Sequence, residues 1–462
     1  MGIGAYLSRF LKDQSVLPGF IGVEILLGFI GAFSVPLCYF FFAFVDSSGY
    51  QFFVLSLVTI IGTLTGFEIP LLTRILNTEG SFEENISDIL TFDYLGALGA
   101  TLLFPFFLLP FIGLYRSSLI FGFINILVAL TTLQFFRNVV NISSKKRLLL
   151  FLSNLAVALV ILFMLIQAKK HLRNWDELIF KYPIIHSENS IYQKIDITQS
   201  NSEFRLYLNG AIQFSSRDEY RYHEALVHVP LSQVENPRRI LVLGGGEGLV
   251  AREILKYEEV EKIVIVDIDP AITELSKKNA LIANLNGNAL DNPKVEVRNE
   301  DAFVFLHSDS VKYDAIIIDL PDPSNESLAR LYSDVFYNLC RGLLDADGVV
   351  ATQATSPHLS TNAFWCINET MRHAGFSYTY PYSVYVPSFG EWGFIMGKLD
   401  PSFNSEFKED IEYAYLEDAL FDHMFYFTKD IRSYEGGVNR LDSPILLDYY
   451  LDHWKSLQGE KR

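Results

Sequence analysis

The sequence has few cysteines and few basic residues for a chain of 462 residues. Its three cysteines, Cys38, Cys340 and Cys366, lie far apart, which excludes a disulfide framework and the close spacing of a zinc site. Lysine and arginine total 37 against 54 acidic residues, so the formal net charge is −17. A field of this sign repels phosphates, which excludes nucleic acid as an expected partner, and it favours small cationic ligands.

Charge and hydropathy are distributed unevenly along the chain. Residues 1–170 contain 10 basic and 9 acidic residues, whereas residues 171–462 contain 27 and 45. The mean hydropathy of +0.22 is high for a soluble enzyme. The sequence therefore predicts a nearly neutral, apolar first third and an acidic, water-soluble remainder in a reducing compartment.

Five apolar runs in the first third predict transmembrane helices, because about 20 apolar residues are needed to cross the ~30 Å core of a bilayer. Glu24 and Glu68 lie inside two of these runs. An intramembrane carboxylate is a candidate for a ligand or proton-relay role, although one near the end of a span can instead reach water. The runs are residues 18–45, 51–72, 93–114, 118–136 and 147–167.

Basic residues around the last run bear on its orientation. Lys169, Lys170 and Arg173 follow the run, and the positive-inside rule places the soluble part in the cytoplasm. Arg137 and residues 145–147 are also basic and would then lie outside, which the same rule disfavours.

From about residue 188 the pattern changes to short strands and helices. Alternating residues predict strands at 190–196 and 204–208, and Asn209-Gly210 predicts a two-residue hairpin into a strand at 211–214. Further strands are predicted at 239–243, 262–267, 294–298, 313–319 and 348–354, with helices at 249–256 and 271–284. Strands alternating with helices predict a parallel, doubly wound, Rossmann-like sheet.

We therefore expect four regions. They are a transmembrane helical domain of about five spans (1–170), a small β-sheet subdomain (188–235), a Rossmann-like catalytic domain (236–400) and a C-terminal extension without an assigned role (401–462).

A glycine-rich turn follows the first strand of the predicted Rossmann-like domain. Gly244 and Gly246 would let a ligand approach the backbone at a helix N-terminus. Asp267 ends the next strand, about 20 residues on, where an acidic residue accepts hydrogen bonds from ribose hydroxyls. Asp301, followed by Ala302, is placed to bind an adenine amino group. In this order the residues predict an adenosine-type ligand, whereas each aspartate alone could simply end a strand or cap a helix.

Glu247, in the same turn, narrows the choice of ligand. Its carboxylate would repel a pyrophosphate and also the carboxylate of S-adenosylmethionine. It suits a sulfonium nucleoside whose chain ends in an ammonium group, as in decarboxylated S-adenosylmethionine. Asp319 and Asp322 lie at the carboxyl end of the fourth strand, where they could hold an ammonium and remove its proton. The alternative for these two is a surface turn rich in aspartate and proline.

These residues belong to motifs that resemble those of spermidine synthases. The motifs cover roughly residues 188–395, and fused to apolar helices they are similar to the multi-span bacterial branch of that family. They are Tyr192-Gln193, LNGAIQ (208–213), RDEYRYHE (217–224), GGGEG (244–248), DID (267–269), Asp301-Ala302, DLPDP (319–323), Gln353 and PSFGEWGF (387–394).

The resemblance implies a class I methyltransferase-type fold and an aminopropyltransferase. Such an enzyme moves the aminopropyl group of decarboxylated S-adenosylmethionine to putrescine, giving spermidine and 5′-methylthioadenosine. It implies that Asp319 accepts the amine proton with help from Tyr222. The implied adenosine-binding residues are Gln193, Asp267, Asp301 and Ala302, and the implied polyamine-binding residues are Gln213, His223, Glu247 and Asp322.

The partners expected from this are a polyamine, the bilayer of the plasma membrane and further copies of the chain in a dimer or tetramer. No metal or other cofactor is expected. Two alternatives stay open: a methyltransferase that uses S-adenosylmethionine, and a transporter or sensor that binds polyamine without turnover.

Overall fold

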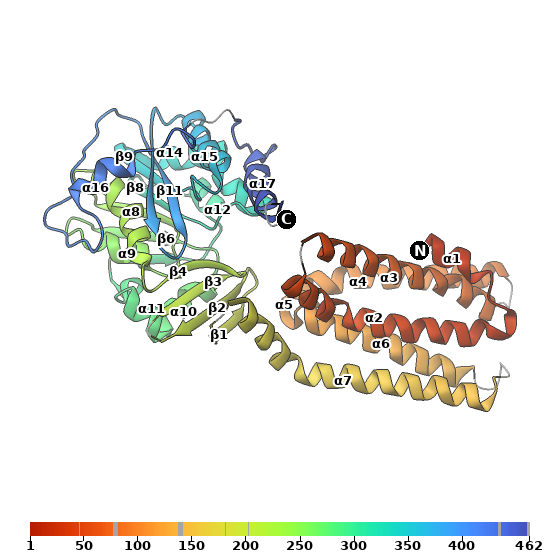
Figure 1. Cartoon of the computed structure of the whole chain (residues 1–462). Helices are drawn as coiled ribbons and strands as arrows, with labels where there is room; N and C mark the ends of the chain where they lie inside the picture. The colour runs from red at the N-terminus through yellow and green to blue at the C-terminus, as the bar shows by residue number, and fades with distance from the viewer. Residues whose placement is uncertain are drawn as a thin grey trace. The chain divides into compact units, whose positions relative to one another are not determined.

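The computed structural model describes residues 1–45, 47–76, 82–136, 142–180, 182–201, 203–432 and 436–459 (Figure 1). The chain divides into two compact units, Met1–Ile184 and Ile185–Arg462. Each has its own buried apolar clusters.

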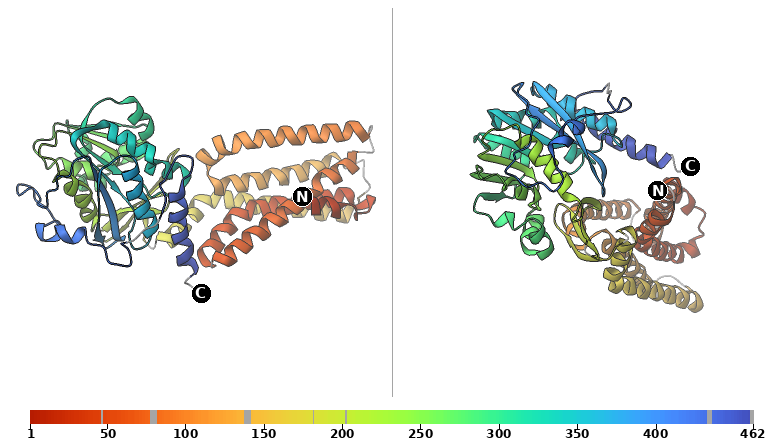
Figure 2. Two further views of the ribbon diagram at one scale, coloured as in Figure 1. Left: turned by 90° about the horizontal axis from the view of Figure 1, so that it is seen from above. Right: turned by 60° about the vertical axis from the view of Figure 1, so that its left-hand side comes forward.

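The first unit consists of helices that run alongside one another (Figure 2). They are α1 (Gly2–Ser8), α2 (Val16–Phe44), α3 (Ser47–Leu76), α4 (Phe82–Leu103), α5 (Leu109–Ile112), α6 (Leu114–Phe135) and α7 (Ser144–Phe180), with a π-helical turn η2 (Phe104–Leu108) between α4 and α5. Five stretches of the described residues are long and apolar enough to cross a membrane, one for each predicted run. These are Asp13–Phe42, Ser48–Leu76, Asn85–Ile112, Leu114–Phe135 and Ser144–Ala168.

The second unit begins with an antiparallel sheet of strand order β1-β2-β3-β4. The strands are β1 (Ile184–Asn189), β2 (Lys194–Ser200), β3 (Glu203–Leu208) and β4 (Ala211–Ser215). Asn209 and Gly210 have φ of 50° and 83°, which confirms the predicted hairpin turn. The single strand predicted at 190–196 is wrong. The Ser190 hydroxyl oxygen accepts hydrogen bonds from the amides of Tyr192 and Gln193, each at 3.0 Å, and this turn separates β1 from β2.

A seven-stranded sheet of order β10-β11-β9-β8-β5-β6-β7 forms the centre of the second unit. The strands are β5 (Arg239–Gly244), β6 (Lys262–Val266), β7 (Val295–Arg298), β8 (Tyr313–Asp319), β9 (Leu344–Gln353), β10 (Tyr378–Val386) and β11 (Gly390–Lys398). The Rossmann-like α/β arrangement is confirmed, and the five predicted strands, β5 to β9, pair in parallel as expected. β10 and β11 were not predicted. The short turn after Val386 makes these two strands antiparallel to each other, and β11 also runs antiparallel to β9.

Helices cover both faces of this sheet. One apolar core packs α8 (Glu219–Leu231), α9 (Leu249–Ile254) and the segment around α16 (Asp418–Met424) against it. The other contains α12 (Ala302–Ser308), α14 (Asp334–Leu343), α15 (Thr361–His373) and α17 (Ile445–Gly459). The small sheet packs on α10 (Pro270–Lys278) and α11 (Ala280–Leu285).

The single helix predicted at 271–284 is wrong, because Asn279 divides it into α10 and α11. Asn279 has an extended backbone, with φ −79° and ψ 115°. Its side-chain oxygen accepts a hydrogen bond from the Leu281 amide at 3.0 Å. Asparagine is a favoured N-cap residue, and here it starts a second helix.

The C-terminal segment is packed onto the Rossmann-like domain. The buried Glu224 carboxylate of α8 accepts hydrogen bonds from the amides of Ala414, Tyr415 and Leu416 at 2.6–3.0 Å. A buried carboxylate is costly unless it is hydrogen-bonded, so these three bonds fix the segment in place.

Candidate active site

The glycine turn and Asp319 meet where β5 and β8 end. Gly244 is paired with Asp319 in the parallel register of these strands. Gly244 has φ of 86°, and a Cβ atom there would lie 1.9 Å from the Asp319 carbonyl oxygen. Only glycine allows this conformation and this approach, so the residue fixes the spacing between turn and loop.

Asp267 holds the opposite side of the turn. Its carboxylate accepts hydrogen bonds from the amides of Gly246 at 3.0 Å and Asp269 at 2.9 Å. A Cβ atom on Gly246 would lie 2.5 Å from the same carboxylate. Burial, with the nearby charge of Glu247, raises the pKa of Asp267 to about 7.

Tyr222 of α8 donates a hydrogen bond to Asp319 Oδ1 at 2.6 Å. Burial and the charge of Asp319 hold the pKa of Tyr222 well above its usual value, so its hydroxyl keeps its proton and donates. Burial and the charge of Glu247 raise the pKa of Asp319 to about 7, although His223 and the bond from Tyr222 act in the opposite direction. Asp319 can therefore accept and release a proton near neutral pH.

His223 and Glu247 complete the cluster. The ligating atoms of His223, Glu247 and Asp319 all lie within 4.8 Å of one another, and His223 Nε2 is 3.7 Å from Glu247 Oε1. His223 Nδ1 donates to Glu219 at 2.7 Å, and Arg252 forms a two-pronged ion pair with Glu219 at 2.7 and 3.0 Å. A buried chain of alternating charge thus leads from Arg252 to the site.

This chain of charge determines what the cluster can bind. Burial opposes protonation of His223, but the hydrogen bond to Glu219 and the nearby carboxylate of Glu247 outweigh it and raise the pKa of His223 to about 10. Two carboxylates then face one imidazolium. The donor set could hold a metal ion, but His223 would first have to give up its proton. A ligand that brings its own positive charge needs no such change.

Gln193 is brought to the end of β6 from the turn between β1 and β2. Its amide donates to Asp269 Oδ2 at 2.9 Å, and the hydroxyl of Ser190 donates to the same oxygen at 2.7 Å. Asp269 also caps α10 by accepting from the Ala271 amide. The sequence analysis assigned Asp269 no role. Its position just after a parallel strand, where ligands of such sheets bind, could have indicated one.

Asp301, Ala302 and Gln213 fit their predicted roles less directly. Asp301 caps α12, which begins at Ala302, and its carboxylate pairs with Arg330. The alternative considered for Asp301, that it caps a helix, is therefore a contact that the structure contains. Gln213 lies on β4, and within the described part of the chain its side-chain amide donates only to the Ala211 carbonyl.

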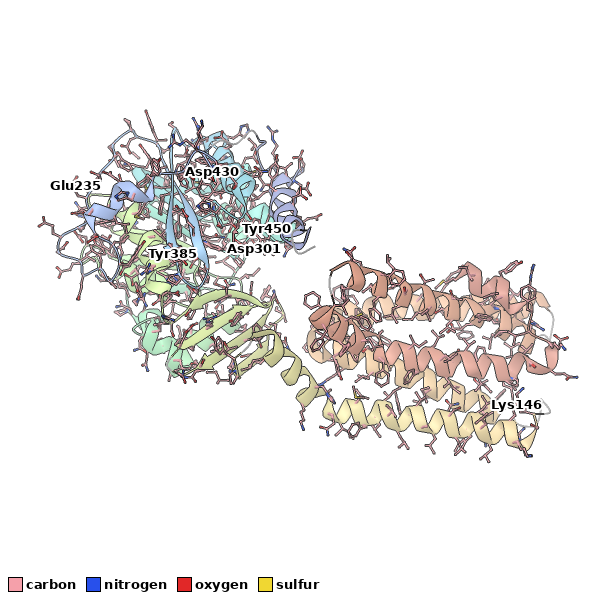
Figure 3. All side chains as sticks on the ribbon, viewed as in Figure 1. Lys146, Glu235, Asp301, Tyr385, Asp430 and Tyr450 are labelled. Carbon is pink, nitrogen blue, oxygen red and sulfur yellow. The ribbon has the colours of Figure 1, made fainter. Side chains whose placement is uncertain are left out.

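The loop of Asp322 is held by the motif residue Gln353 and by two tyrosines that the sequence analysis did not identify. Gln353 Nε2 donates to the Leu320 carbonyl at 2.8 Å and approaches Asp322 Oδ1 at 3.4 Å. Tyr332, fully buried, donates to the Leu320 carbonyl at 3.1 Å. Tyr450 of α17 donates to Asp322 Oδ2 at 3.2 Å. Figure 3 labels Tyr450 on the ribbon of the second unit. Burial raises the pKa of Asp322 to about 6, and the bonds from Tyr450 and Gln353 limit the rise.

Replacement of Tyr450 by phenylalanine should affect the amine more than the nucleoside donor. The Tyr450→Phe variant loses the bond that orients Asp322, so we expect KM for the amine to rise several-fold, by about 3–10-fold for a lost bond of about 1 kcal/mol, with kcat little changed. Steady-state kinetics with each substrate varied will test this. The control is Tyr385→Phe on β10, because Tyr385 is 58% exposed. An equal loss in both variants, or a change confined to kcat, contradicts the positioning role.

The raised carboxylate pKa values also predict the pH dependence of stability. A carboxyl whose folded pKa lies above its unfolded value binds more protons when folded, so its contribution to stability is lost as pH rises toward the folded pKa. Asp267, Asp319 and Asp322 act in this direction, whereas His228, whose buried imidazole has a lowered pKa, opposes them below about pH 6.5.

We expect the thermal midpoint of the ligand-free protein to fall by several degrees between about pH 5 and about pH 8, and to fall less in Asp319→Asn. Circular dichroism melts of both proteins across this range will measure the difference. Identical slopes would show that Asp319 does not titrate in this window.

Comparison with known proteins gives consistent matches. The family described as "Spermine/spermidine synthase domain" matches residues 219–409. "Polyamine aminopropyltransferase 2" of Ralstonia nicotianae is 41% identical over 462 residues, covering 98% of this chain and 89% of the relative. "Polyamine aminopropyltransferase" of Leptospira interrogans is 38% identical over 458 residues, covering 99% of this chain and 90% of the relative.

A solved structure matches the second part of the chain. It is a spermidine synthase in complex with the transition-state analogue AdoDATO, with 25% identity and a TM-score of 0.50. The similarity covers 54% of this chain and 87% of that one. The curated relatives therefore match along nearly the whole chain, and the solved one along about half of it.

Proposed function

The chain belongs to the polyamine aminopropyltransferase family, and from this we propose that it transfers the aminopropyl group of decarboxylated S-adenosylmethionine to putrescine. The products are spermidine and 5′-methylthioadenosine. The observation that carries the proposal is the cluster of Tyr222, His223, Glu247 and Asp319 beside the glycine turn.

The donor suits the side of the site made by β5 and β6. Gly244 and Gly246 leave the backbone accessible, and Asp267 accepts hydrogen bonds from the turn while its carboxylate lies where ribose hydroxyls bind in this fold. Glu247 supplies a carboxylate for the ammonium end of the donor chain. Decarboxylated S-adenosylmethionine is the co-substrate, and the reaction needs no further cofactor.

Proton removal is the chemical task of the acceptor side. An alkylammonium has a pKa near that of lysine, about 10.4, so at neutral pH putrescine is mostly protonated and cannot attack the donor carbon. Asp319, with Tyr222 fixed on one carboxylate oxygen, accepts the proton from this ammonium. The freed amine attacks the methylene carbon next to the sulfonium, the carbon–sulfur bond breaks, and its electron pair leaves on the sulfur of methylthioadenosine. Holding both substrates in line contributes much of the rate.

The carboxyl groups of the site explain why both substrates would bind as cations. Three carboxyl groups, those of Glu247, Asp319 and Asp322, accompany the single imidazolium of His223, and the pKa values of Asp319 and Asp322 are raised in the empty site. The positive charges of a bound sulfonium and ammonium favour the ionised carboxylates and so lower these pKa values. The substrates thereby convert Asp319 into its ionised, proton-accepting form.

The methyltransferase alternative is disfavoured by Glu247. S-adenosylmethionine carries a carboxylate at its chain end, and Glu247 would repel it. The alternative of a transporter or sensor without turnover does not account for a hydrogen-bonded Tyr222–Asp319 pair whose carboxyl pKa lies near neutral.

The test is an assay of the purified full-length protein with decarboxylated S-adenosylmethionine and a panel of diamines and triamines. We expect methylthioadenosine release with putrescine and no methyl transfer from S-adenosylmethionine. Methyl transfer without methylthioadenosine, or binding of putrescine without either product, contradicts the proposal.

We also propose that the first unit anchors the enzyme in the plasma membrane, with the catalytic unit in the cytoplasm. Apolar side chains exposed on its helices support this, among them Phe106 at 74%, Leu149 at 66% and Phe163 at 57%. The orienting residue Arg137 and the side chains of Lys169 and Arg173 lie outside the described residues. Carbonate extraction of cell membranes tests the anchor: a spanning protein stays in the pellet, whereas a peripheral one is released.

Assembly into a dimer or tetramer is proposed on the basis of β10. This strand forms one edge of the seven-stranded sheet and exposes Tyr378 and Tyr385. An exposed edge strand is a surface that natural proteins often cover. Mass photometry of the detergent-solubilised protein tests this, and a monomer contradicts it.

A further inference from the structure

The helical unit contains a cavity that the aminopropyl-transfer reaction does not use. Its volume is about 310 Å³, and residues of α2, α3, η2 and α6 line it. This volume lies at the lower end of the range of small-molecule sites, about 300–1,000 Å³. The side chains that line it fall into a polar group and an apolar group.

The hydroxyl groups of the cavity can act only as acceptors. Ser34 donates its hydrogen to the Gly31 carbonyl at 2.7 Å, Thr65 donates to Ile61 at 3.0 Å, and Ser118 donates to Tyr115 at 2.9 Å. A hydroxyl has one hydrogen, so the lone pairs of these three oxygens are what remains for a ligand. Among the side chains that line the cavity, Asn125 alone retains amide donors. The cavity is therefore built to receive a hydrogen-bond donor.

Two carboxylates set its charge. Glu68 lines the cavity directly. Glu24 is 5% exposed and lies on the same face of α2 as Leu27, Gly31 and Ser34, which line the cavity at positions i+3, i+7 and i+10. Within the described residues Glu24 has no hydrogen bond or ion pair, so its carboxyl group is buried without a partner there.

The two carboxylates lie at a similar depth in the bundle. Glu24 follows the start of α2 at Val16 by eight residues, and Glu68 precedes the end of α3 at Leu76 by eight residues. At 1.5 Å per residue each is roughly 12 Å, or two turns, from its helix end. Among the described residues that line the cavity there is no lysine or arginine, and Arg74, further along α3, is paired with Asp13. The negative charge is thus left for a ligand to compensate.

The remaining wall is apolar and aromatic. Leu27, Ile61 and Leu114 line it together with Phe104 and Phe121, whose ring centroids are 6.3 Å apart. Aromatic faces attract ammonium groups, and aliphatic side chains accommodate methylenes. A bare metal ion would need six to eight oxygen ligands or water in their place, which this wall does not supply.

We propose that this cavity is a second ligand site, which binds a linear alkylammonium ion with its charged end at Glu68 and Glu24 and its methylenes against the apolar wall. The choice of a diamine or triamine as the probe rests on the proposed function of the second unit. The evidence for the binding site itself is the cavity, its two carboxyl groups and the three hydroxyls whose hydrogens are already donated to backbone carbonyls.

The test uses the full-length protein in detergent, with the reaction site closed. The transition-state analogue AdoDATO at saturation should occupy that site, and radiolabelled spermidine or putrescine is then titrated. We expect about one equivalent of label to bind. Glu68→Gln should weaken this binding by about 10-fold or more, as expected for the loss of a charge-assisted contact, while methylthioadenosine release stays at the wild-type rate.

Asp88→Asn is the matched control, because Asp88 is an exposed carboxylate of α4 that does not line the cavity. Asn125→Leu is a second variant, which narrows the cavity without changing its charge, and it should also weaken the AdoDATO-resistant binding. The site is disproved if no label binds under AdoDATO, if Asp88→Asn and Glu68→Gln weaken it equally, or if a co-purified phospholipid holds the cavity against excess spermidine. A protein that lacks turnover but retains this binding would refute the proposed function alone.

Discussion

Asp319→Asn is expected to lower the rate of methylthioadenosine formation by about 10²-fold or more, the usual contribution of a positioned base. Asparagine keeps the shape of the side chain and can still accept the 2.6 Å hydrogen bond from Tyr222, so the fold and donor binding should persist. It cannot take the proton of the attacking ammonium. The loss should therefore appear in kcat, with the Kd for decarboxylated S-adenosylmethionine within a few-fold of wild type.

The pH profile separates loss of the base from a general disturbance of the site. In the wild-type protein the rate should rise as pH increases through the pKa of Asp319, which burial and Glu247 raise to about 7 in the empty site. In Asp319→Asn the levelling of the rate above that pKa should disappear, and the much lower residual rate should keep rising with the fraction of neutral amine, whose pKa is about 10.4. Asp345→Asn is a suitable control, because Asp345 is exposed at the amino end of β9. A variant within a few-fold of wild type, or one that keeps the same pH profile, excludes Asp319 as the base.

The position of these residues could be predicted because it follows from strand direction. A parallel sheet places the ends of successive strands at one edge, so a glycine turn after β5, Asp267 after β6 and Asp319 at the end of β8 had to converge. The hairpin at Asn209-Gly210 was equally local, since two adjacent residues with positive φ are enough to specify it.

Contacts between segments distant in sequence could not be predicted from the residue pattern. The partnership of Tyr222 with Asp319, 97 residues apart, was expected only from the family resemblance, and the bond from Tyr450 to Asp322, which spans 128 residues, was not expected at all. Both contacts depend on how helices pack on the sheet, which no periodic pattern specifies. The antiparallel direction of β11 and the helix break at Asn279 were missed for a different reason. A short turn sets the direction of β11, and a single capping side chain starts a new helix at Asn279, so neither feature follows from the periodicity of the neighbouring residues.

Glu247→Gln is expected to weaken the binding of decarboxylated S-adenosylmethionine by about 10- to 100-fold, the effect of losing a charge-assisted hydrogen bond worth about 1.5–3 kcal/mol. Methylthioadenosine has the same adenosine and sulfur but no ammonium, so its Kd should change by less than about 3-fold. Calorimetry with both ligands measures the two effects directly. The control is Glu258→Gln, since Glu258 is exposed and lies outside the cluster.

The same substitution should also change the proton chemistry of the site, because Glu247 acts on both of its neighbours. Its charge is one cause of the raised pKa of Asp319, and its carboxylate, 3.7 Å from His223 Nε2, is one cause of the raised pKa of His223. In Glu247→Gln both pKa values should fall, and the acid limb of the kcat profile should move to lower pH. If both ligands lose affinity equally and the profile does not move, Glu247 neither binds the ammonium of the donor nor tunes Asp319. The preference for a decarboxylated donor would then have to come from another part of the pocket.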